Sequence, residues 1–173
     1  MMPSRKLDSF GKPLISKKGD ELIRQGESDT SLYVVVQGLL KAYYLTSDGK
    51  ELIKSFIQPG EIIGSLTACY LGEKSTFSLV CLEDSKLLKI PFESLKSIEN
   101  IQPELSGEII QSLVGLALKK ERREYEFLCL SAPERYELLK QRSPDLVEHL
   151  TQNDIARYLG ITPVALSRIK GRQ

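Results

Sequence analysis

The sequence predicts an α+β protein with a small β jelly-roll barrel first, a long helix next and a helix-turn-helix domain last. Three observations lead to this fold class. Between residues 14 and 91, short runs of apolar and β-branched residues alternate with turn signals. Residues 102–128 instead repeat apolar residues at helical spacing. The stretch TQNDIARYLGITPVALSRIK, residues 151–170, carries the caps of two short helices joined by a tight turn.

The barrel is expected from the regular spacing of its strand-like runs. These runs are SLYVVV, LLKAYYL, LIKSFI, FSLVCL and KLLKI. The breaks between them contain glycine, as in Ser47-Asp48-Gly49 and Pro59-Gly60. Many short strands at such spacing are typical of a small barrel or jelly roll. The glycines are assigned no chemistry, because tight turns often need a positive φ angle.

A long helix and a hinge are expected after the barrel. The helix has two open interpretations, because its apolar face could pack on the chain's own barrel or pair with a second copy. Gly115 and the charged run KKERRE weaken that face toward its end. After a break at residues 129–132, Ser131 and Pro133 are typical of the start of another helix. The apolar positions of the long helix are Leu105, Ile109, Leu113, Leu116 and Phe127.

The last stretch contains the start and stop signals of two helices. Thr151 and Asp154 can cap the first helix reciprocally, and Gly160 is suited to end it. Thr162 and Pro163 are a typical cap and first residue of the second helix. The apolar positions Ile155, Ala156 and Leu159 of the first helix would face Leu166 and Ile169 of the second. A generic helical hairpin would show the same caps.

The second helix of such a motif can lie in a DNA major groove. Its outer face would then present Val164 and Ala165 to thymine methyl groups and Ser167 to a base or phosphate. Arg168 is the strong donor to bases or phosphates on that face. Near the two helix starts, the expected phosphate contacts are Thr151, Gln152 and Thr162, and Pro163 and Lys170 complete the candidate DNA surface. The alternative for Val164 is an ordinary helix-surface residue, and the alternative for Arg168 and Lys170 is ordinary solvated surface charges.

The composition limits how the chain could bind nucleic acid. The chain has 41% hydrophobic and 27% charged residues, as ordinary globular proteins do, and a net charge of only +1. Binding to nucleic acid must therefore come from a local patch. Residues 151–173 hold four basic side chains and one acidic one, an excess of 4 − 1 = 3. These are Arg157, Arg168, Lys170 and Arg172 against Asp154.

Other classes of protein are disfavoured. No apolar run is long enough to span a bilayer and no signal peptide is visible, so no membrane role and a cytoplasmic location are expected. The three scattered cysteines fit reduced thiols, and His149 is the only histidine. Clustered metal ligands and a Ser–His–Asp arrangement are both missing, so we expect no metal, no cofactor and no enzyme activity.

The pattern T-Q-x-D-I-A-x-x-L-G-I-T-P-x-x-L-S-R closely resembles the helix-turn-helix of the Crp/Fnr family of bacterial transcription regulators. The blocks KKGDELIRQGE, YVVVQGLLKAYYLTSDGKE and PGEIIGSL resemble the family's cyclic-nucleotide-binding-like sensor barrel. The resemblance covers residues 14–170. It implies a barrel over residues 1–100, a dimerisation helix and hinge over 101–130, and a DNA-binding domain over 131–173. It also implies a homodimer that binds palindromic double-stranded DNA, with the hinge letting the barrel reposition the DNA-binding domain.

The resemblance also locates an effector pocket. Relatives that bind cyclic nucleotides have a glycine, a glutamate and, ten residues later, an arginine for the phosphate. Gly64 keeps its place here, while Ser65 and Ser75 stand at the two charged positions. With Leu66 and Thr76, these residues suit a neutral or weakly charged small effector, or no effector, better than a cyclic nucleotide. Iron–sulfur sensing in this family uses four cysteines, one more than this chain has.

The DNA end departs from the best-known family pattern. An arginine and a glutamate of that pattern are replaced by Pro163 and Val164, and only Arg168 is kept. We therefore expect weak specificity and an affinity that falls steeply with salt. Typical members continue into a β-hairpin wing, so a chain ending at Gln173 lacks most or all of the wing, either as a compact subgroup or as an incomplete chain. The rival function is a sensor or scaffold module that binds a protein and no DNA.

Overall fold

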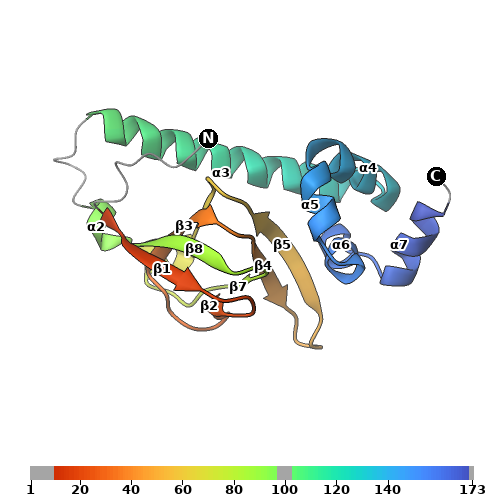
Figure 1. Cartoon of the computed structure of the whole chain (residues 1–173), viewed down its shortest axis with the longest axis horizontal. Coiled ribbons are helices and arrows are strands. Elements are labelled where there is room, and N and C mark those ends of the chain that lie inside the picture. Colours follow the sequence, from red (N-terminus) through yellow and green to blue (C-terminus); the bar gives the residue numbers. More distant parts are fainter. Residues whose placement is uncertain (1–9, 97–102, 172–173) are drawn as a thin grey trace.

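The computed structural model describes residues 10–96 and 103–171 of the chain. A β barrel lies below a long helix in Figure 1, and a group of short helices lies at one end of that helix. The α+β order predicted from the sequence is confirmed. The strands are β1 (Lys12–Ser16), β2 (Glu21–Ile23), β3 (Ser31–Gln37), β4 (Leu40–Leu45), β5 (Glu51–Ile57), β6 (Ile62–Ile63), β7 (Ser78–Cys81) and β8 (Ser85–Pro91). The helices are α1 (Leu66–Leu71), α2 (Glu93–Lys96), α3 (Pro103–Cys129), α4 (Ala132–Arg142), α5 (Pro144–His149), α6 (Gln152–Leu159) and α7 (Pro163–Lys170).

The eight strands form two four-stranded sheets with antiparallel pairing. One sheet has the order β1-β8-β3-β6 and the other has the order β2-β7-β4-β5. Strand β3 is buried on both faces, which explains its continuous apolar run. Tyr33 and Val35 belong to the core between the sheets, whereas Leu32 and Val34 pack on the other side against β8 and α1. The strand-like runs recognised in the sequence correspond to β3, β4, β5, β7 and β8.

Glycine at the β3–β4 turn is a steric requirement. Gly38 has a φ of +100°, which side chains rarely adopt. An added Cβ would clash with the Ser85 hydroxyl oxygen and lie 2.9 Å from the Asp84 carbonyl oxygen. The turn glycines Gly19, Gly26, Gly49 and Gly60 also have positive φ angles. The structural role expected for these glycines is therefore confirmed.

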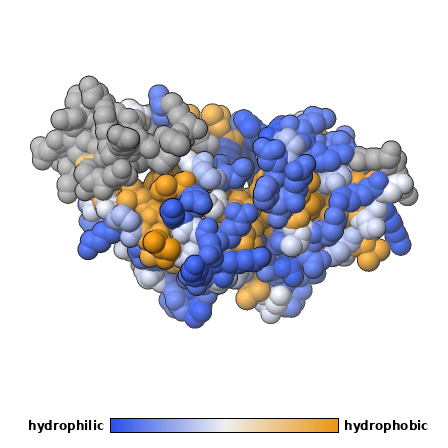
Figure 2. Space-filling model, viewed as in Figure 1, coloured by the Kyte–Doolittle hydropathy of each residue, from blue (hydrophilic) through white to orange (hydrophobic). Residues whose placement is uncertain are grey.

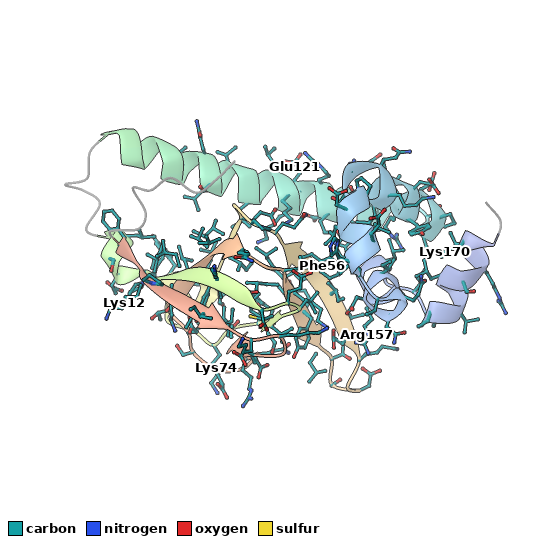
Figure 3. All side chains as sticks on the ribbon, viewed as in Figure 1. Lys12, Phe56, Lys74, Glu121, Arg157 and Lys170 are labelled. Carbon is teal, nitrogen blue, oxygen red and sulfur yellow. The ribbon has the colours of Figure 1, made fainter. Side chains whose placement is uncertain are left out.

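A second core joins the barrel to the helical end of the chain. On the barrel side it contains Leu39, which directly precedes β4, and Ile53 and Phe56 of β5. On the helical side it contains buried residues of α4 to α7, including Ile155 and Leu159 of α6. Figure 3 shows Phe56 and Arg157 close to this boundary. The helix-turn-helix is thus packed on the barrel as well as linked to it by α3.

Helix α3 presents two different faces. Toward the barrel it carries Leu116, Lys119, Arg123 and Glu126, which are half-buried or buried. Away from the barrel it carries five apolar side chains that recur within one face and are each half or more exposed. We call this set the exposed apolar stripe: Ile110, Val114, Leu118, Tyr125 and Leu128.

The predicted apolar face of the long helix was only partly right. Leu116 is half-buried against the barrel side, as one interpretation required. Leu113 is 51% exposed, because helical phase turns it away from the barrel. The ring of Phe127, which is 44% exposed, lies beside Gly160 in the turn of the helix-turn-helix. The side chains of Leu105 and Ile109 lie outside the described part of the structure. Packing on the chain's own barrel thus involves one face of α3, which is largely charged. Pairing with a second copy would involve the opposite face, which is apolar.

Two short helices were not predicted. Helices α1 and α5 have six residues each, too few for apolar periodicity to show. Ser65 caps α1, and Gly72, with a φ of +70°, ends it, so flanking residues were the available signal. Across the described residues, no helix combines the length and apolar character needed to cross a membrane. Nor do these residues contain a group of three or more His, Cys, Asp and Glu side chains that could hold a metal ion.

Candidate nucleic-acid interface

The first helix of the motif, α6, begins with the predicted cap. Thr151 Oγ1 accepts a hydrogen bond from the backbone N–H of Asp154 at 3.1 Å. The same hydroxyl donates to the Asp154 carboxylate at 2.5 Å. Ile155, Ala156 and Leu159 are buried, as the helical spacing predicted. The cap and the apolar face of this helix are therefore confirmed.

The turn between the two helices depends on Gly160. Its φ is +70° and its backbone N–H caps the end of α6. A Cβ at this position would lie 2.9 Å from the ring of Phe127 on α3. Glycine is thus favoured at this position both by the left-handed backbone conformation and by the closeness of α3.

The second helix, α7, also starts as predicted. Thr162 Oγ1 accepts a hydrogen bond from Ala165 N–H at 3.2 Å, and Pro163 is the first helical residue. Leu166 is fully buried against α6, and Ile169 is half-buried in the same core. These contacts fix which face of α7 points outward.

The outward face carries the predicted DNA contacts. Val164 is 62% exposed, so it lies on the surface of α7 and not in the core. Lys170 is exposed, and its Nζ lies 6.0 Å from the centre of the Tyr136 ring on α4. Ala165 is half-buried. The remaining predicted residues are all exposed, namely Thr151, Gln152, Thr162, Pro163, Ser167 and Arg168.

The basic side chains counted at residues 151–173 of the sequence do not all lie on one face of the structure. Arg157 points to the barrel, where its Nη1 lies 3.1 Å from Glu51 Oε2. Asp154 also faces the barrel, 3.4 Å from Lys41 Nζ, and Lys41 pairs with Glu51 at 2.6 Å. Arg157 therefore does not belong to the outward face. Arg168 has no carboxylate partner within the described ranges, which leaves its guanidinium available.

Arg123 of α3 connects the barrel with the helix-turn-helix. Its Nη2 donates to the carbonyl oxygens of Ile53 on β5, at 3.3 Å, and of Tyr158 on α6. Its guanidinium carbon lies 3.8 Å from the centre of the Tyr158 ring and 4.4 Å from that of Phe127. Burial lowers the pKa of Arg123 from its ordinary value. Sequence reasoning missed this residue, because it lies within a charged run that looks solvated.

The predicted effector pocket is tightly packed at its first residues. A Cβ on Gly64 would lie 2.5 Å from Leu32 Cδ2 and 2.7 Å from the Ser31 carbonyl oxygen, so packing requires glycine there. Ser65 is buried, and its hydroxyl accepts a hydrogen bond from Ala68 N–H at 3.3 Å as the cap of α1. Leu66 is the first residue of α1 and is 40% exposed.

At the other end of the predicted pocket, Ser75 also forms hydrogen bonds with nearby residues. The buried Ser75 hydroxyl donates to the Phe77 carbonyl oxygen at 2.8 Å. The Ser75 backbone exchanges hydrogen bonds of 2.8 Å with Gly26 and Glu27. Thr76 is exposed. Both serine hydroxyls thus stabilise their own backbone, and the assignment of a ligand to them stays a prediction.

Comparisons with known proteins agree with this architecture. The model of the cyclic nucleotide-binding domain family matches residues 15–100. The fumarate and nitrate reduction regulatory protein of Salmonella typhi is 33% identical over 167 residues, which cover 90% of this chain and 66% of that protein. The protein of that name from Escherichia coli K12 is 32% identical over 167 residues, with the same coverage. The chain thus spans 66% of these relatives, slightly less than two thirds.

Solved structures share the fold along most of the chain. The c-di-GMP responsive global regulator CLP of Xanthomonas campestris has a TM-score of 0.78 at 17% identity, covering 96% of this chain and 88% of its own. FixK2 of Bradyrhizobium japonicum has a TM-score of 0.74 at 20% identity, covering 94% and 83%. A CRP/FNR family regulator of Thermus thermophilus has a TM-score of 0.72 at 19% identity, covering 93% and 84%. At such identities these structures establish the fold alone.

A barrel of the cyclic nucleotide-binding type joined through a long helix to a helix-turn-helix defines a class of two-domain proteins. Within that class, the relatives and the matching barrel model identify the family: the chain belongs to the Crp/Fnr family. The wing expected to be missing would follow Gly171, the last described residue, so that expectation stays a prediction.

Proposed function

We propose that the protein is a DNA-binding transcription regulator of the Crp/Fnr type that acts in the cytoplasm as a homodimer. The observation that supports this most is the outward face of α7. Val164 and Arg168 are exposed there, while Leu166 behind them is fully buried. The helix is therefore fixed to the domain and free on the side that a major groove would receive.

In this proposal, phosphate and base contacts have separate origins. Thr151, Gln152 and Thr162 lie at or beside helix starts and would bind phosphates. Arg168 and Ser167 would reach base edges or phosphates, and Val164 would contact a thymine methyl group. Pro163, Ala165 and Lys170 would complete the surface. Figure 2 shows hydrophilic residues over much of the helical end of the molecule on the face in view.

The homodimer would form through the exposed apolar stripe of α3. Five apolar side chains on one face of a surface helix are costly in water unless a partner covers them. A second copy of the same helix would cover them symmetrically, since a two-fold dimer pairs one patch with itself. Such a dimer would place two α7 helices so that each can bind one half of a palindromic site.

The sensor barrel would respond to a small effector other than a cyclic nucleotide. Ser65 and Ser75 have no charge with which to neutralise a cyclic phosphate, and both hydroxyls already bond to the backbone. An effector that binds one arrangement of barrel and helical domain more tightly would change the population of that arrangement. The proposal involves binding only and assigns the protein no catalytic step.

Selection from a random double-stranded DNA pool at low salt tests this function. The proposal predicts enrichment of a palindromic motif, with binding that weakens steeply as salt increases. Enrichment of no sequence, together with a stable protein partner that competes for the face formed by residues 151–170, would support the rival scaffold function. That rival is favoured by the small number of charged side chains on α7, which are Arg168 and Lys170.

A further inference from the structure

The first turn of α7 presents apolar side chains on the face that the proposed function assigns to the major groove. Its first three residues are Pro163, Val164 and Ala165, and Val164 is 62% exposed. Proline has no backbone N–H. The Ala165 N–H is already bound to the Thr162 hydroxyl oxygen at 3.2 Å. This turn therefore has few groups that could form hydrogen bonds with the edges of bases.

The packing of α7 fixes which side chains point outward together. Leu166 is fully buried against α6, and it lies two positions from both Val164 and Arg168. Successive residues of an α-helix are about 100° apart, so Val164 and Arg168 share the side opposite Leu166. Both are exposed, and Figure 1 shows α7 at the end of the molecule away from the barrel. One apolar and one cationic side chain thus lie on the same open face.

An apolar side chain can recognise one kind of group in the major groove. That group is the methyl at C5 of thymine, because the other features of the base edges are hydrogen-bond donors and acceptors. 5-Methylcytosine carries the same methyl group at the same ring position. The two bases differ at C4, where thymine has a carbonyl oxygen and cytosine has an amino group. Val164 cannot form a hydrogen bond with either group through its side chain, so it would accept both bases.

The second turn of α7 supplies the polar contact. The Arg168 guanidinium can donate two hydrogen bonds to O6 and N7 of one guanine. Arg168 follows Val164 by four residues, which is about 6 Å along the helix axis. Base pairs are about 3.4 Å apart, so the guanine would lie about two base pairs from the methylated base. The exposed Ser167 can bond to more than one kind of base and adds little discrimination.

We propose that the protein reads a 5-methyl group in each half of its DNA site through Val164, together with a guanine about two base pairs away through Arg168. Thymine and 5-methylcytosine are then equivalent at the first position, whereas uracil and unmethylated cytosine are disfavoured. Methylation of cytosine at C5 therefore strengthens binding to a site that has cytosine at this position. The inference rests on the proposed function, because it concerns the same face of α7.

Binding to base analogues of a duplex selected by the unmodified protein tests this inference. Each thymine is replaced in turn, symmetrically in both half-sites, by deoxyuridine, which lacks only the methyl group. We expect one position at which this change weakens binding roughly 15-fold, since each lost methyl contact costs about fourfold. At that position, a pair of 5-methylcytosine with guanine should restore most of the lost affinity, and a pair of unmethylated cytosine with guanine should not.

Two variants of α7 separate this contact from the rest of the interface. Val164→Ala should reduce the ratio of affinities for the thymine and deoxyuridine duplexes to less than about fourfold, because it removes two methyl groups from the contact. Arg168→Ala should bind both duplexes more weakly and keep the ratio between them. Both residues are exposed, so neither change should disturb folding.

Three outcomes would overturn the inference. They are a selected duplex in which no thymine responds to deoxyuridine, an unchanged ratio in Val164→Ala, and equal binding of methylated and unmethylated cytosine. Failure of the proposed function looks different, because the selection would then enrich no duplex at all, and the inference would fail with it.

Discussion

Arg157 Nη1 of α6 lies 3.1 Å from Glu51 Oε2 of β5, so the helix-turn-helix is ion-paired to the barrel across 106 positions of sequence. Lys41 extends the contact, because its Nζ lies near both Glu51 and Asp154. Two basic and two acidic side chains, two from the barrel and two from α6, thus form one connected set of ion pairs. The β4–β5 hairpin therefore holds α6, the first helix of the helix-turn-helix, against the barrel.

Glu51→Gln should weaken this contact between the domains. The change leaves Arg157 without its carboxylate and Lys41 with Asp154 alone at 3.4 Å. Because Lys41 is 8% exposed, we expect a loss of about 1–3 kcal/mol in the free energy of unfolding. Urea denaturation followed by tyrosine fluorescence measures this, since the chain has seven tyrosines and no tryptophan.

Lys50→Met is the control for this change. Lys50 pairs with Asp48 at 3.7 Å at the tip of the same hairpin, but both side chains are more than 60% exposed. An exposed pair contributes little, so stability should change by less than about 0.5 kcal/mol. Equal losses from Glu51→Gln and Lys50→Met would show that the buried charges do not hold the domains together.

Gly160→Ala should destabilise the turn of the helix-turn-helix. The φ of +70° is unfavourable for alanine, and its Cβ would lie 2.9 Å from the Phe127 ring. We expect a loss of roughly 1–3 kcal/mol, measured as a lower Tm. Gly171→Ala is the matched control, because Gly171 has a φ of −77° and no close neighbour. A neutral Gly160→Ala would contradict the close packing of this turn on α3.

Lys54→Met should make the protein more stable at neutral pH. The folded pKa of Lys54, about 8, is lower than its ordinary value of 10.5, so folding disfavours its charge. The resulting destabilisation is complete below pH 8, shrinks as the pH rises from 8 to 10.5, and is absent above that. Allowing for partial exposure, we expect a gain of roughly 1–2 kcal/mol at pH 7.

A pH series of unfolding measurements checks this expectation. The gain from Lys54→Met should disappear as the pH approaches 10.5, whereas Lys86→Met should have little effect at any pH. A gain that stays constant from pH 7 to 10.5 would mean that improved packing, and not removal of the charge, stabilises the variant.

Val114→Asp should convert the proposed dimer to a monomer. The residue lies in the exposed apolar stripe of α3 and is 51% exposed, so the monomer should fold normally. Across a two-fold interface the change places two carboxylates near each other and removes apolar contact. Sedimentation analysis should then show half the mass. Lys74→Asp on the exposed barrel surface is the control and should leave the mass unchanged.

Local features of this fold could be predicted because they depend on neighbouring residues. Thr151, Gly160, Thr162 and Pro163 occupy the cap and turn positions expected of them, since caps bond within three or four residues. The apolar runs likewise predicted five strands. The family resemblance added the expected homodimer, the palindromic DNA and the place of an effector pocket, which local patterns alone leave open.

The joint between the domains could not be predicted. Arg157 was counted with the DNA-facing charges, but it binds Glu51, whose place in the sequence gives no sign of this contact. Arg123 was considered only as part of the charged run KKERRE, although its guanidinium lies over the rings of Tyr158 and Phe127. Such pairings depend on how complete domains pack, and a single sequence contains no local signal for that.

The affinity of Arg168→Ala for a DNA duplex selected by the unmodified protein tests the central claim most directly. Fluorescence anisotropy at low salt should show a loss of at least about tenfold, because Arg168 is the strong donor on the exposed face of α7. Lys74→Ala, on the barrel, should bind as the unmodified protein does. Equal affinities for the unmodified protein, Arg168→Ala and Lys74→Ala would contradict the assignment of α7 to the major groove.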